Sequence, residues 1–564
     1  MTSKAPAIVI LGPGGLATAR RIRQRYPDAL IHGLAGRVEG VDRQYVEFGA
    51  TLRQLYQAGS PIIALCAAGI VIRTLAPLLL EKGAEPPVLA VAEDGSAVVP
   101  LLGGLGGVNV LARELGVTLQ IAAAITTSGE LRFGTCLLNP PSGYCLGDLE
   151  QGKRFVSDLL AGEAVRIEGA APWLDQAQLP QDDQARLAIR VDCAAGVPAA
   201  DELRIYPRNV VVAVGAGAVP AIEDVLREAG VAVQSLACLL AADGDMACPQ
   251  LREAAALLGV PLRFMAGGTD PGQWLREALD QSASIRTVGH CVVAVTERPI
   301  DPQRMGRPRG RLAVIGLGPG AADLMVPAVR AELDRATDVL GYETYVRMAG
   351  PLRPDQVQHC TDNREEMQRA RHAFQLAAQG RSVVVVSSGD PGVFAMAAAV
   401  LEALHESSDP AWHNVDLQIL PGVSASLATA AQAGAPLGHD FCVMSLSDNL
   451  KPWTIIEKRL DLAAEADLAL AFYNPISRSR PWQLGRALEI VAQHRTPDTP
   501  VVLGRDIGRP GQTLRVTTLG QLTPDQVDMR TLVIIGSSTT CVFPRPNGGV
   551  WAYTPRWYGE KPGG

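Results

Sequence analysis

Short apolar runs recur along the chain, and each is followed by glycine and then by a stretch with helical spacing. These runs are AIVILGPGG from Ala7, PIIALCAAG from Pro61, NVVVAVGAG from Asn209, RLAVIGLGPG from Arg311 and SVVVVSSGD from Ser382. Apolar strands that alternate with helices are typical of parallel sheets covered by helices on both faces. The pattern therefore predicts an α/β fold throughout.

Two polar, proline-containing segments interrupt the pattern: LPQDDQARL from Leu179, and ERPIDPQRMGRPRGR from Glu297 to Arg311. Such composition is typical of linkers, and 564 residues exceed one ordinary core. We expect small α/β units in the N-terminal half, then a linker, a two-lobed domain and a tail. The expected ranges are 1–135, 136–205, 206–298, 299–310 (linker), 311–545 (lobes of about 311–420 and 421–545) and 546–564 (tail). The fold of 136–205 stays open.

Charge and cysteine content exclude several classes of protein. The net charge is −7 and the pI about 5.7, so no global basic field exists to bind a nucleic acid. The ten cysteines form no CxxC pair, so we expect no metal ligands, no disulfide framework and a cytoplasmic location. Gly12 to Gly15 break the first apolar run, unlike a signal peptide. The run from Val210 is far below the roughly 18 residues that span a membrane.

Four glycine or proline corners follow apolar runs in the C-terminal half. They are GLGPG at Gly316, SSGDPGVF at Ser387, LPGVSASLA at Leu420 and AFYNPISRSR at Ala471. The first is not a complete dinucleotide fingerprint, because Ala321 stands where GxGxxG requires glycine. Strand ends at one edge of an open parallel sheet are where ligands bind. We therefore expect the corners to form one site, although any one of them alone is more typical of an ordinary turn.

Three longer motifs narrow the interpretation: HDFCVMSLSDNLKPWTIIEKRL from His439, FYNPISRSR from Phe472 and VDMRTLVIIGSSTT from Val527. Together with GxGPG and GDP, they make this half resemble the tetrapyrrole (class III) S-adenosylmethionine methyltransferases over essentially its whole length. Within that family the resemblance is to the branch that methylates carbon 17 of precorrin-3B or of its cobalt counterpart. Ser537 departs from the branch, which has asparagine there. The resemblance implies a two-lobed fold with the cofactor, S-adenosylmethionine, in the cleft between the lobes.

The resemblance also implies the residues that bind the cofactor. They are Gly389, Asp390, Val393, Phe394, Ser424, Ala425, Phe472, Tyr473, Asn474, Gly504, Thr531, Leu532 and Val533. Glycine at 389 permits close approach of the backbone, and Asp390 can accept a hydrogen bond from a cofactor hydroxyl or amine. Alternatively, Asp390 is only part of a turn, because Asp-Pro-Gly favours turns.

The substrate that the resemblance implies is an anionic macrocycle rimmed by carboxylates, which arginine binds well. The first glycine loop would border its trough through Gly316, Gly318 and Pro319. Arg478 and Arg480 are the first arginine candidates because they follow FYNP directly. The other arginine candidates are Arg347, Arg364 and Arg505.

Proton removal during carbon methylation needs a base. Glu343 in GYETY is the candidate, because some relatives have an acidic residue there at the trough, and Tyr342 would be a neighbouring hydrogen-bond donor. A glutamate in a buried turn that serves structure alone is the alternative.

The N-terminal half resembles the cobalt-precorrin-5A hydrolases, which open the ring A lactone. Its motifs are CAAGIVIRTLAPLL from Cys66, PPVLAVAEDGSAVVPLLGGLGGVNVLA from Pro86 and AAAITTSGE from Ala122. The likeness is good over about 7–135 and weak over 208–265. However, GGLGGVN lacks the histidine of the family loop, and ester hydrolysis needs a base near an oxyanion site. We expect no base beside glycines 103 to 107; the remaining polar positions are Arg73, Glu93, Asp94, Asn109 and Thr126.

These observations predict methylation of carbon 17 of precorrin-3B, or of cobalt-factor III, with ring contraction to precorrin-4 in cobalamin biosynthesis. We expect a homodimer through the methyltransferase domain, with no nucleic-acid or membrane partner. Two alternatives stay open for the N-terminal half: a second activity that opens the cobalt-precorrin-5A lactone, or a non-catalytic scaffold that binds substrate. The missing histidine favours the scaffold.

Overall fold

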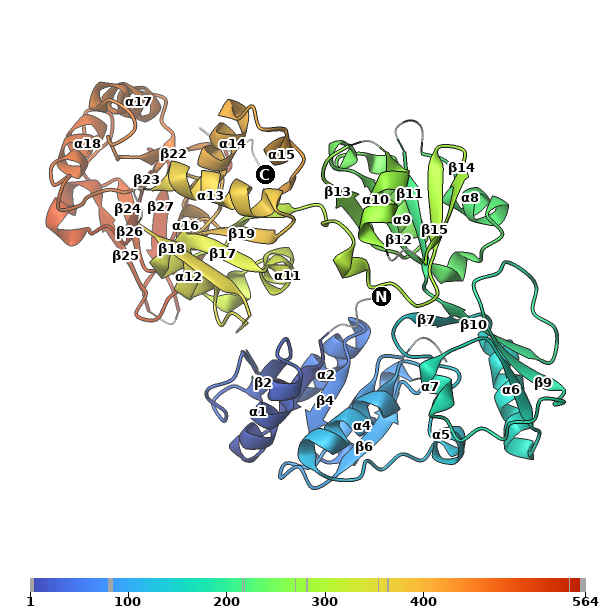
Figure 1. Ribbon diagram of the computed structural model, residues 1–564. Coiled ribbons are helices and arrows are strands. Elements are labelled where there is room, and N and C mark those ends of the chain that lie inside the picture. Colours follow the sequence, from blue (N-terminus) through green and yellow to red (C-terminus); the bar gives the residue numbers. More distant parts are fainter. Residues whose placement is uncertain are drawn as a thin grey trace.

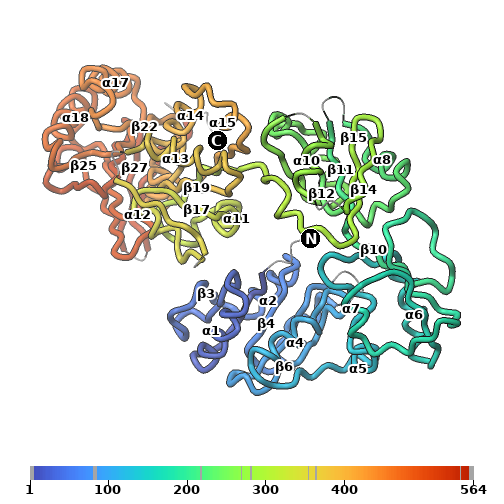
Figure 2. Tube along the Cα trace, in the orientation of Figure 1, coloured from blue at the N-terminus to red at the C-terminus, as the bar shows by residue number. Residues whose placement is uncertain are grey.

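The computed structural model describes residues 5–79, 85–215, 217, 219–268, 270–279, 282–353, 355–362, 365–546 and 548–557. Figure 1 shows the N-terminal half in blue to green and the C-terminal half in yellow to red, joined by an extended segment. Figure 2 follows the same path along the chain trace. The multidomain α/β architecture that the sequence predicts is confirmed.

The first sheet has the strand order β3-β2-β1-β4-β5-β6. Its strands are β1 (Ala7–Ile10), β2 (Leu30–Leu34), β3 (Arg43–Tyr45), β4 (Ile62–Leu65), β5 (Val88–Val91) and β6 (Val98–Leu102). Its helices are α1 (Leu16–Arg25), α2 (Phe48–Gln57), α3 (Ala68–Leu75) and α4 (Val108–Leu119), and α5 (Ser128–Phe133) follows them. Ile8 and Ile10 pack in one core layer and Val9 in another, so both faces are buried. The strands are parallel except β6.

The second sheet forms the part whose fold the sequence left open. Its order is β7-β10-β9-β8. The elements are β7 (Tyr144–Leu146), α6 (Leu149–Ala161), β8 (Val165–Glu168), α7 (Pro172–Asp175), β9 (Leu187–Val191) and β10 (Glu202–Pro207). Strand β10 is antiparallel to β7 and parallel to β9, so this is a mixed sheet.

The third sheet has the order β13-β12-β11-β15-β14. Its elements are β11 (Val210–Val214), α8 (Ile222–Glu228), β12 (Leu236–Ala242), α9 (Pro249–Leu257), β13 (Leu262–Met265), α10 (Pro271–Ala278), β14 (Ser284–Val288) and β15 (Cys291–Val295). The parallel pairing that the sequence predicts holds for β11 to β13. It is wrong for β15, which runs antiparallel to β11 and β14. A two-residue loop, with Gly289 at φ +57, joins β14 to β15 and allows only antiparallel pairing.

The fourth sheet begins the C-terminal half and is parallel, in the order β18-β17-β19-β16-β20. Its strands are β16 (Arg311–Gly316), β17 (Asp338–Tyr342), β18 (Val357–Thr361), β19 (Ser382–Ser387) and β20 (Asp416–Leu420). The helices are α11 (Pro327–Arg335), α12 (Glu343–Ala349), α13 (Glu366–Ala378), α14 (Met396–Glu406) and α15 (Pro410–His413). Core layers on both faces bury β16, β17 and β19, whereas the edge strands β18 and β20 are partly exposed.

The fifth sheet has the order β22-β23-β26-β24-β25 and is largely antiparallel. Its strands are β22 (Phe441–Ser445), β23 (Ala469–Tyr473), β24 (Pro500–Arg505), β25 (Thr513–Thr518) and β26 (Thr531–Ile535). The helices are α16 (Ala425–Ala433), α17 (Trp453–Glu465) and α18 (Gln483–Val491). A small sheet beside it contains β21 (Gly434–Ala435), β27 (Cys541–Pro544) and β28 (Val550–Tyr553).

Two segments expected to be a linker and a tail carry ordered structure. Met305, within 299–310, is buried against the third sheet, and the backbone of Arg307 pairs with that of Phe264. Strand β28 lies within 546–564, and Ala552 is fully buried. Met305 and Ala552 are apolar residues, and their burial anchors the two segments. The rest of the domain division stays a prediction.

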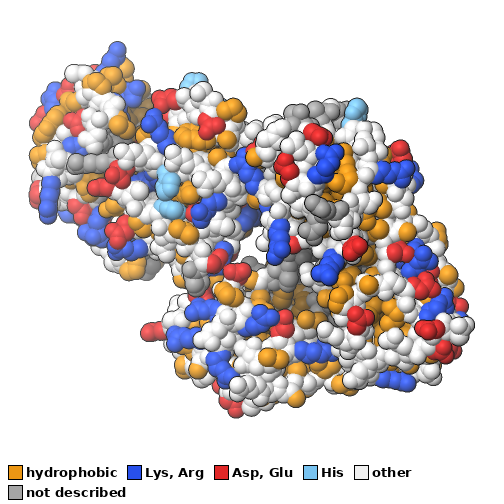
Figure 3. All heavy atoms as spheres, in the orientation of Figure 1, with side chains coloured by type: hydrophobic (Ala, Val, Ile, Leu, Met, Phe, Trp, Pro, Cys, Tyr) orange, Lys and Arg blue, Asp and Glu red, His pale blue; other side chains and the backbone are white. Residues whose placement is uncertain are grey.

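Among the described residues, neither a candidate membrane span nor a candidate metal site is present. No helix there is long and apolar enough to cross a membrane, and no three His, Cys, Asp or Glu side chains are placed to hold a metal ion. On the face drawn in Figure 3, basic and acidic side chains are interspersed.

Candidate functional site

Three of the four corners meet at one edge of the fourth sheet, because β16, β19 and β20 are parallel neighbours. A Cβ added to Gly316 would lie 2.4 Å from the carbonyl oxygen of Gly389, and one added to Gly422 would lie 2.2 Å from the same oxygen. Gly389 has φ +68, which favours glycine. Gly318 and Gly389 also exchange backbone hydrogen bonds of 3.1 and 2.8 Å. Only glycine allows these loops to pack so closely.

Asp390 links two of the corners. Its Oδ1 accepts a hydrogen bond from the Gly392 amide at 2.8 Å, and its Oδ2 accepts one from the Gly422 amide at 3.1 Å. Both carboxylate oxygens therefore have partners within the chain. This geometry supports a role in shaping the loops, and contact with a cofactor stays a prediction.

Tyr473 joins the fourth corner to the third. Its hydroxyl accepts a hydrogen bond from the Ser426 amide at 2.9 Å and lies 3.0 Å from Ser426 Oγ. Ser424 begins α16, and its hydroxyl lies 3.0 Å from that of Ser426. The ring of Phe394 packs edge-on against Tyr473, with centroids 5.5 Å apart. Residues from separate motifs thus form one cluster of hydroxyls and aromatic rings.

Two residues of this cluster have unfavourable backbone conformations. Phe394 has φ +53 and Asn474 has φ +49, in the region that favours glycine. The Asn474 side chain donates to Ser445 Oγ at 3.0 Å, which helps to fix it. Backbone strain of this kind gathers at functional sites, because the surrounding structure has to maintain it.

Sequence reasoning missed Lys451 at the rim of this cluster. Its Nζ lies 5.9 Å from the centroid of the Phe394 ring. Burial, with a contribution from Arg459, lowers the pKa of the Lys451 ammonium. A sequence signal existed, because Lys451 lies within the branch motif SLSDNLKPW, just after β22.

Other predicted cofactor residues lie deeper. Phe472 and Val533 are cross-strand partners whose side chains pack in the core, so contact with a ligand would have to use their backbone atoms. Gly504 lies opposite Leu532, and a Cβ added there would be 2.4 Å from Thr429 Cγ2. Among the described residues, the buried hydroxyl of Thr429 has no hydrogen-bond partner.

The remaining three predicted cofactor residues differ in position. Val393 and Ala425 are half-buried beside the cluster. Thr531 donates to Asp528 Oδ1 at 2.7 Å, at the end of β26.

The two leading arginines have different surroundings. Arg478 is exposed and has no partner within the described part of the chain. Arg480 is buried, and it donates to the carbonyl of Asn474 at 3.0 Å. Arg478 is therefore available to a ligand, whereas Arg480 supports the loop that carries Asn474.

The other arginine candidates are engaged or outside the structure. Arg505 donates to Asp528 at 2.8 Å and pairs with Asp506. Arg347 pairs with Glu343 one helical turn away. Arg364 lies outside the described residues.

The candidate base lies at the same edge of the fourth sheet, since Tyr342 ends β17 beside β19. Glu343 starts α12 and is exposed, so it is not the buried turn glutamate of the alternative; its pair with Arg347 still fits a structural role. Tyr342 packs edge-on against Tyr345, with centroids 5.4 Å apart. Burial raises the pKa of the Tyr345 hydroxyl. The catalytic role of Glu343 and Tyr342 stays a prediction.

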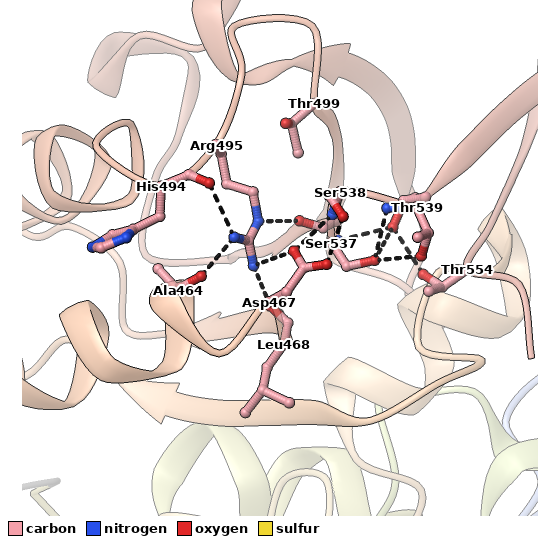
Figure 4. A network of polar contacts seen from close by, with 12 residues as sticks. Ala464, Asp467, Leu468, His494, Arg495, Thr499, Ser537, Ser538, Thr539 and Thr554 are labelled. Carbon is pink, nitrogen blue, oxygen red and sulfur yellow. Dashed lines mark hydrogen bonds and ion pairs between the residues drawn. The ribbon is translucent and has the colours of Figure 1, made fainter. Parts of the chain in front are cut away.

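Ser537, where the chain departs from its branch, lies away from these loops. Ser537 follows the end of β26, where Ile535 pairs with Leu470 near the start of the antiparallel strand β23. Tyr473 lies at the opposite end of β23. Figure 4 shows the local network, in which Arg495 contacts the carboxylate of Asp467 at 3.1 Å. The Ser537 hydroxyl lies 3.0 Å from that of Thr539. The GSSTT motif therefore has a structural role here.

A carboxylate that the sequence did not indicate lies one contact away from the N-terminal glycine loop, and the expectation that no base lies beside that loop stays a prediction. Glu130 is buried, with Oε1 accepting from Asn109 at 2.7 Å and Oε2 accepting from Arg113 at 2.6 Å. Asn109 lies in the first turn of α4, directly after the loop. The contact was missed because 21 residues separate Glu130 from Asn109. Both oxygens of this carboxylate are already occupied.

Glu93 and the glycine loop at 103–107 lie at opposite ends of β5 in the first sheet. The antiparallel pair Val88–Leu102 places Gly103 at the start of β5, whereas Glu93 follows the end of that strand. The Glu93 carboxylate instead faces the loop after β1, since a Cβ on Gly14 would lie 3.1 Å from its Oε2. Glu93 and the glycine loop at 103–107 therefore do not form one site.

The other polar candidates of this half lie at separate places. Thr126 precedes α5, and Arg73 lies in the last turn of α3. Asp94 Oδ1 accepts from the Ser96 amide at 2.9 Å.

Comparison with known proteins gives two family matches. Residues 311–523 match the model of the Tetrapyrrole (Corrin/Porphyrin) Methylases, and residues 50–130 match that of Cobalamin synthesis G N-terminal. A Precorrin-3B C(17)-methyltransferase from Sinorhizobium sp is 50% identical over 249 residues, 44% of this chain and 97% of the relative. Cobalamin biosynthesis protein CobIJ from Mycobacterium tuberculosis is 48% identical over 44% of this chain, which spans only 49% of that relative.

A crystal structure of the methyltransferase CobJ has 51% sequence identity; it covers 44% of this chain and 100% of its own, with a TM-score of 0.41. The identity and near-complete coverage of the Sinorhizobium relative fix the assignment. The chain belongs to the tetrapyrrole (corrin/porphyrin) methylases.

Proposed function

We propose that the chain transfers a methyl group from S-adenosylmethionine to carbon 17 of precorrin-3B, or of cobalt-factor III, with ring contraction to precorrin-4. One observation carries the proposal. The interlocked glycines Gly316, Gly389 and Gly422 lie beside the Tyr473–Ser426 cluster, in the half that is 50% identical to a precorrin-3B C(17)-methyltransferase.

The residues of the cluster fit the cofactor. S-adenosylmethionine supplies the methyl group from a cationic sulfonium. Phe394 and Tyr473 provide aromatic faces, which attract such a cation. Ser424, the Asn474 amide and the unpartnered hydroxyl of Thr429 offer hydrogen bonds to the adenosine and amino acid ends. We assign the predicted cofactor residues to these roles.

The substrate would lie against the first glycine loop, with its carboxylates near cations at the rim. Arg478 is exposed and Lys451 is half-buried beside Phe394, and neither has a carboxylate partner among the described residues. Glu343 would accept the proton that leaves the macrocycle. Orientation of the nucleophilic carbon contributes most of the rate, because methyl transfer requires in-line approach.

The match of residues 50–130 to Cobalamin synthesis G N-terminal supports a second candidate function, opening of the cobalt-precorrin-5A lactone. Against it, both carboxylate oxygens of Glu130 are occupied by Asn109 and Arg113. We propose a scaffold that binds substrate for this half.

We also propose a homodimer through the methyltransferase domain, in the cytoplasm. Phe543, Trp551 and Tyr553 share one face of the β27–β28 pair, and all three are exposed. The ten cysteines are all free, as a reducing compartment requires. Sedimentation of the full chain and of Phe543→Ser tests the interface; a monomeric wild type would exclude it.

The direct test of the function uses the full chain with methyl-labelled S-adenosylmethionine and either precorrin-3B or cobalt-factor III. Incorporation of label into one macrocycle supports the proposal and identifies the metal state of the substrate. Failure of both to take up label would refute it.

A further inference from the structure

Arg509 links the two lobes at the predicted site. It lies in the loop between β24 and β25 of the fifth sheet. Its Nε donates to the carbonyl of Pro319 at 2.9 Å, and its Nη2 donates to Ser388 Oγ at 3.2 Å. Pro319 belongs to the glycine loop after β16, and Ser388 directly precedes Gly389 in the loop after β19. One side chain therefore bonds to both loops.

The backbone around Arg509 fits closely against the first of these loops. A Cβ on Gly508 would lie 2.8 Å from Pro319 Cγ, and one on Gly320 would lie 2.7 Å from Arg509 Cγ. Gly508 has φ +82 and its amide donates to the side chain of Gln512 at 2.8 Å.

The base of the Arg509 loop is also fixed. Asp506 has φ +50, and its buried carboxylate accepts from Arg530 Nε at 2.8 Å. The Arg509 amide donates to the carbonyl of Asp506 at 2.9 Å. The guanidinium is thus held in a defined position before any ligand binds.

We propose that Arg509 is a positioning residue, which holds the loop of Pro319 and the loop of Ser388 in the relative position that methyl transfer requires. The inference rests on the proposed function, in which the first loop borders the macrocycle and the second borders the cofactor. The two loops also exchange the hydrogen bonds between Gly318 and Gly389. Because the planar guanidinium has donors in a fixed fork, it reaches two acceptors at once, which a lysine ammonium does less well.

The test compares Arg509→Ala and Arg509→Lys with a matched control, Arg515→Ala. Arg515 is exposed on β25 and has no partner among the described residues. In the full chain, we expect kcat with the macrocycle to fall at least about tenfold in both Arg509 variants, since small misplacement of reacting groups is costly. The dissociation constant of S-adenosylmethionine, measured by calorimetry, should change less than about threefold, because the acceptors of Arg509, Pro319 and Ser388, are not predicted cofactor residues.

Hydrogen exchange of the Gly318 and Gly389 amides gives a readout that needs no substrate. It should accelerate about tenfold in Arg509→Ala, and the control should match the wild type. Unchanged exchange and unchanged kcat in Arg509→Ala would overturn the inference, as would an equal loss in Arg515→Ala. A wild-type chain without activity would refute the proposed function, whereas the exchange result would still decide whether Arg509 holds the loops.

Discussion

The hydroxyl of Tyr473 lies 2.9 Å from the amide nitrogen of Ser426, and this hydrogen bond ties the end of β23 to the first turn of α16. It also places the ring of Tyr473 against Phe394, whose loop follows β19. Tyr473 and Ser426 are 47 residues apart in the chain, and together with Phe394 they form one surface.

Tyr473→Phe should weaken binding of S-adenosylmethionine by about 1 to 2 kcal/mol. The change keeps the ring but leaves the buried amide of Ser426 without its acceptor, and an unsatisfied group of this kind costs that much. Calorimetry on the full chain measures the effect. Tyr56→Phe in α2 is the control, because its hydroxyl has no hydrogen-bond partner among the described residues. Unchanged binding in Tyr473→Phe would exclude the cluster from the cofactor site.

Asp390→Ala should weaken cofactor binding by about 1 to 3 kcal/mol, because the amides of Gly392 and Gly422 lose their acceptor and the two loops lose a link. Asp409→Ala is a matched control, since its Oδ1 accepts from the Ala411 amide at 2.9 Å in a similar turn away from the corners. If both variants bind the cofactor equally well, the GDP motif serves only to form a turn.

The N-terminal half should not hydrolyse the ring A lactone at a useful rate. Attack by water on an ester needs a base and a site for the oxyanion. Glu130 is held by Arg113 and Asn109, and Glu93 lies at the opposite sheet edge from the glycine loop. The measurement is acetaldehyde release from cobalt-precorrin-5A by the full chain, with an active hydrolase as reference. Release at a comparable rate would contradict the scaffold, and Glu130→Gln would then show whether this carboxylate is the base.

Acidification should destabilise the first sheet through His32 of β2. Burial, reinforced by Arg43, lowers the pKa of His32 to about 4 from its usual 6.5, so the folded state prefers the neutral ring. The unfolded chain takes up the proton first. Stability from this group is therefore complete above pH 6.5 and is lost as the pH falls toward 4; between pH 7 and pH 5 the loss should be about 1 to 2 kcal/mol.

Hydrogen exchange of the β1 and β2 amides measures this local stability, corrected for the intrinsic rate at each pH. His32→Gln should remove most of the pH dependence, whereas His413→Gln, at an exposed histidine of α15, should not. Equal pH dependence in the wild type and His32→Gln would show that other groups cause it.

The sequence was sufficient for the parts of the fold that depend on local patterns. Val383 to Val386 form a run that is typical of a strand buried on both faces, and the parallel strands brought Gly316 and Gly389 to one edge as expected. The antiparallel strands were missed, because the run from Val210 is equally apolar whether its neighbour is parallel or antiparallel. Only the short loop at Gly289 indicated the difference.

The clustering of the candidate residues was predictable where they belong to sequence motifs, and not where it depends on long-range contacts. Tyr473 and Ser424 lie in motifs and were predicted. Arg509 reaches Pro319 across 190 residues, and nothing in the spacing of either residue indicates that contact. Arg480 was expected to bind the substrate because of its place after FYNP, but its burial and its bond to Asn474 O depend on the folded loop.

The carbon that receives the methyl group distinguishes the proposed activity from other methylations of the macrocycle. The full chain is incubated with precorrin-3B or with cobalt-factor III, and with S-adenosylmethionine carrying a carbon-13 methyl group, and the product is examined by nuclear magnetic resonance. We expect one new labelled methyl resonance, coupled to carbon 17 of a ring-contracted macrocycle. Label on any other carbon, or a labelled product whose ring is not contracted, would contradict it.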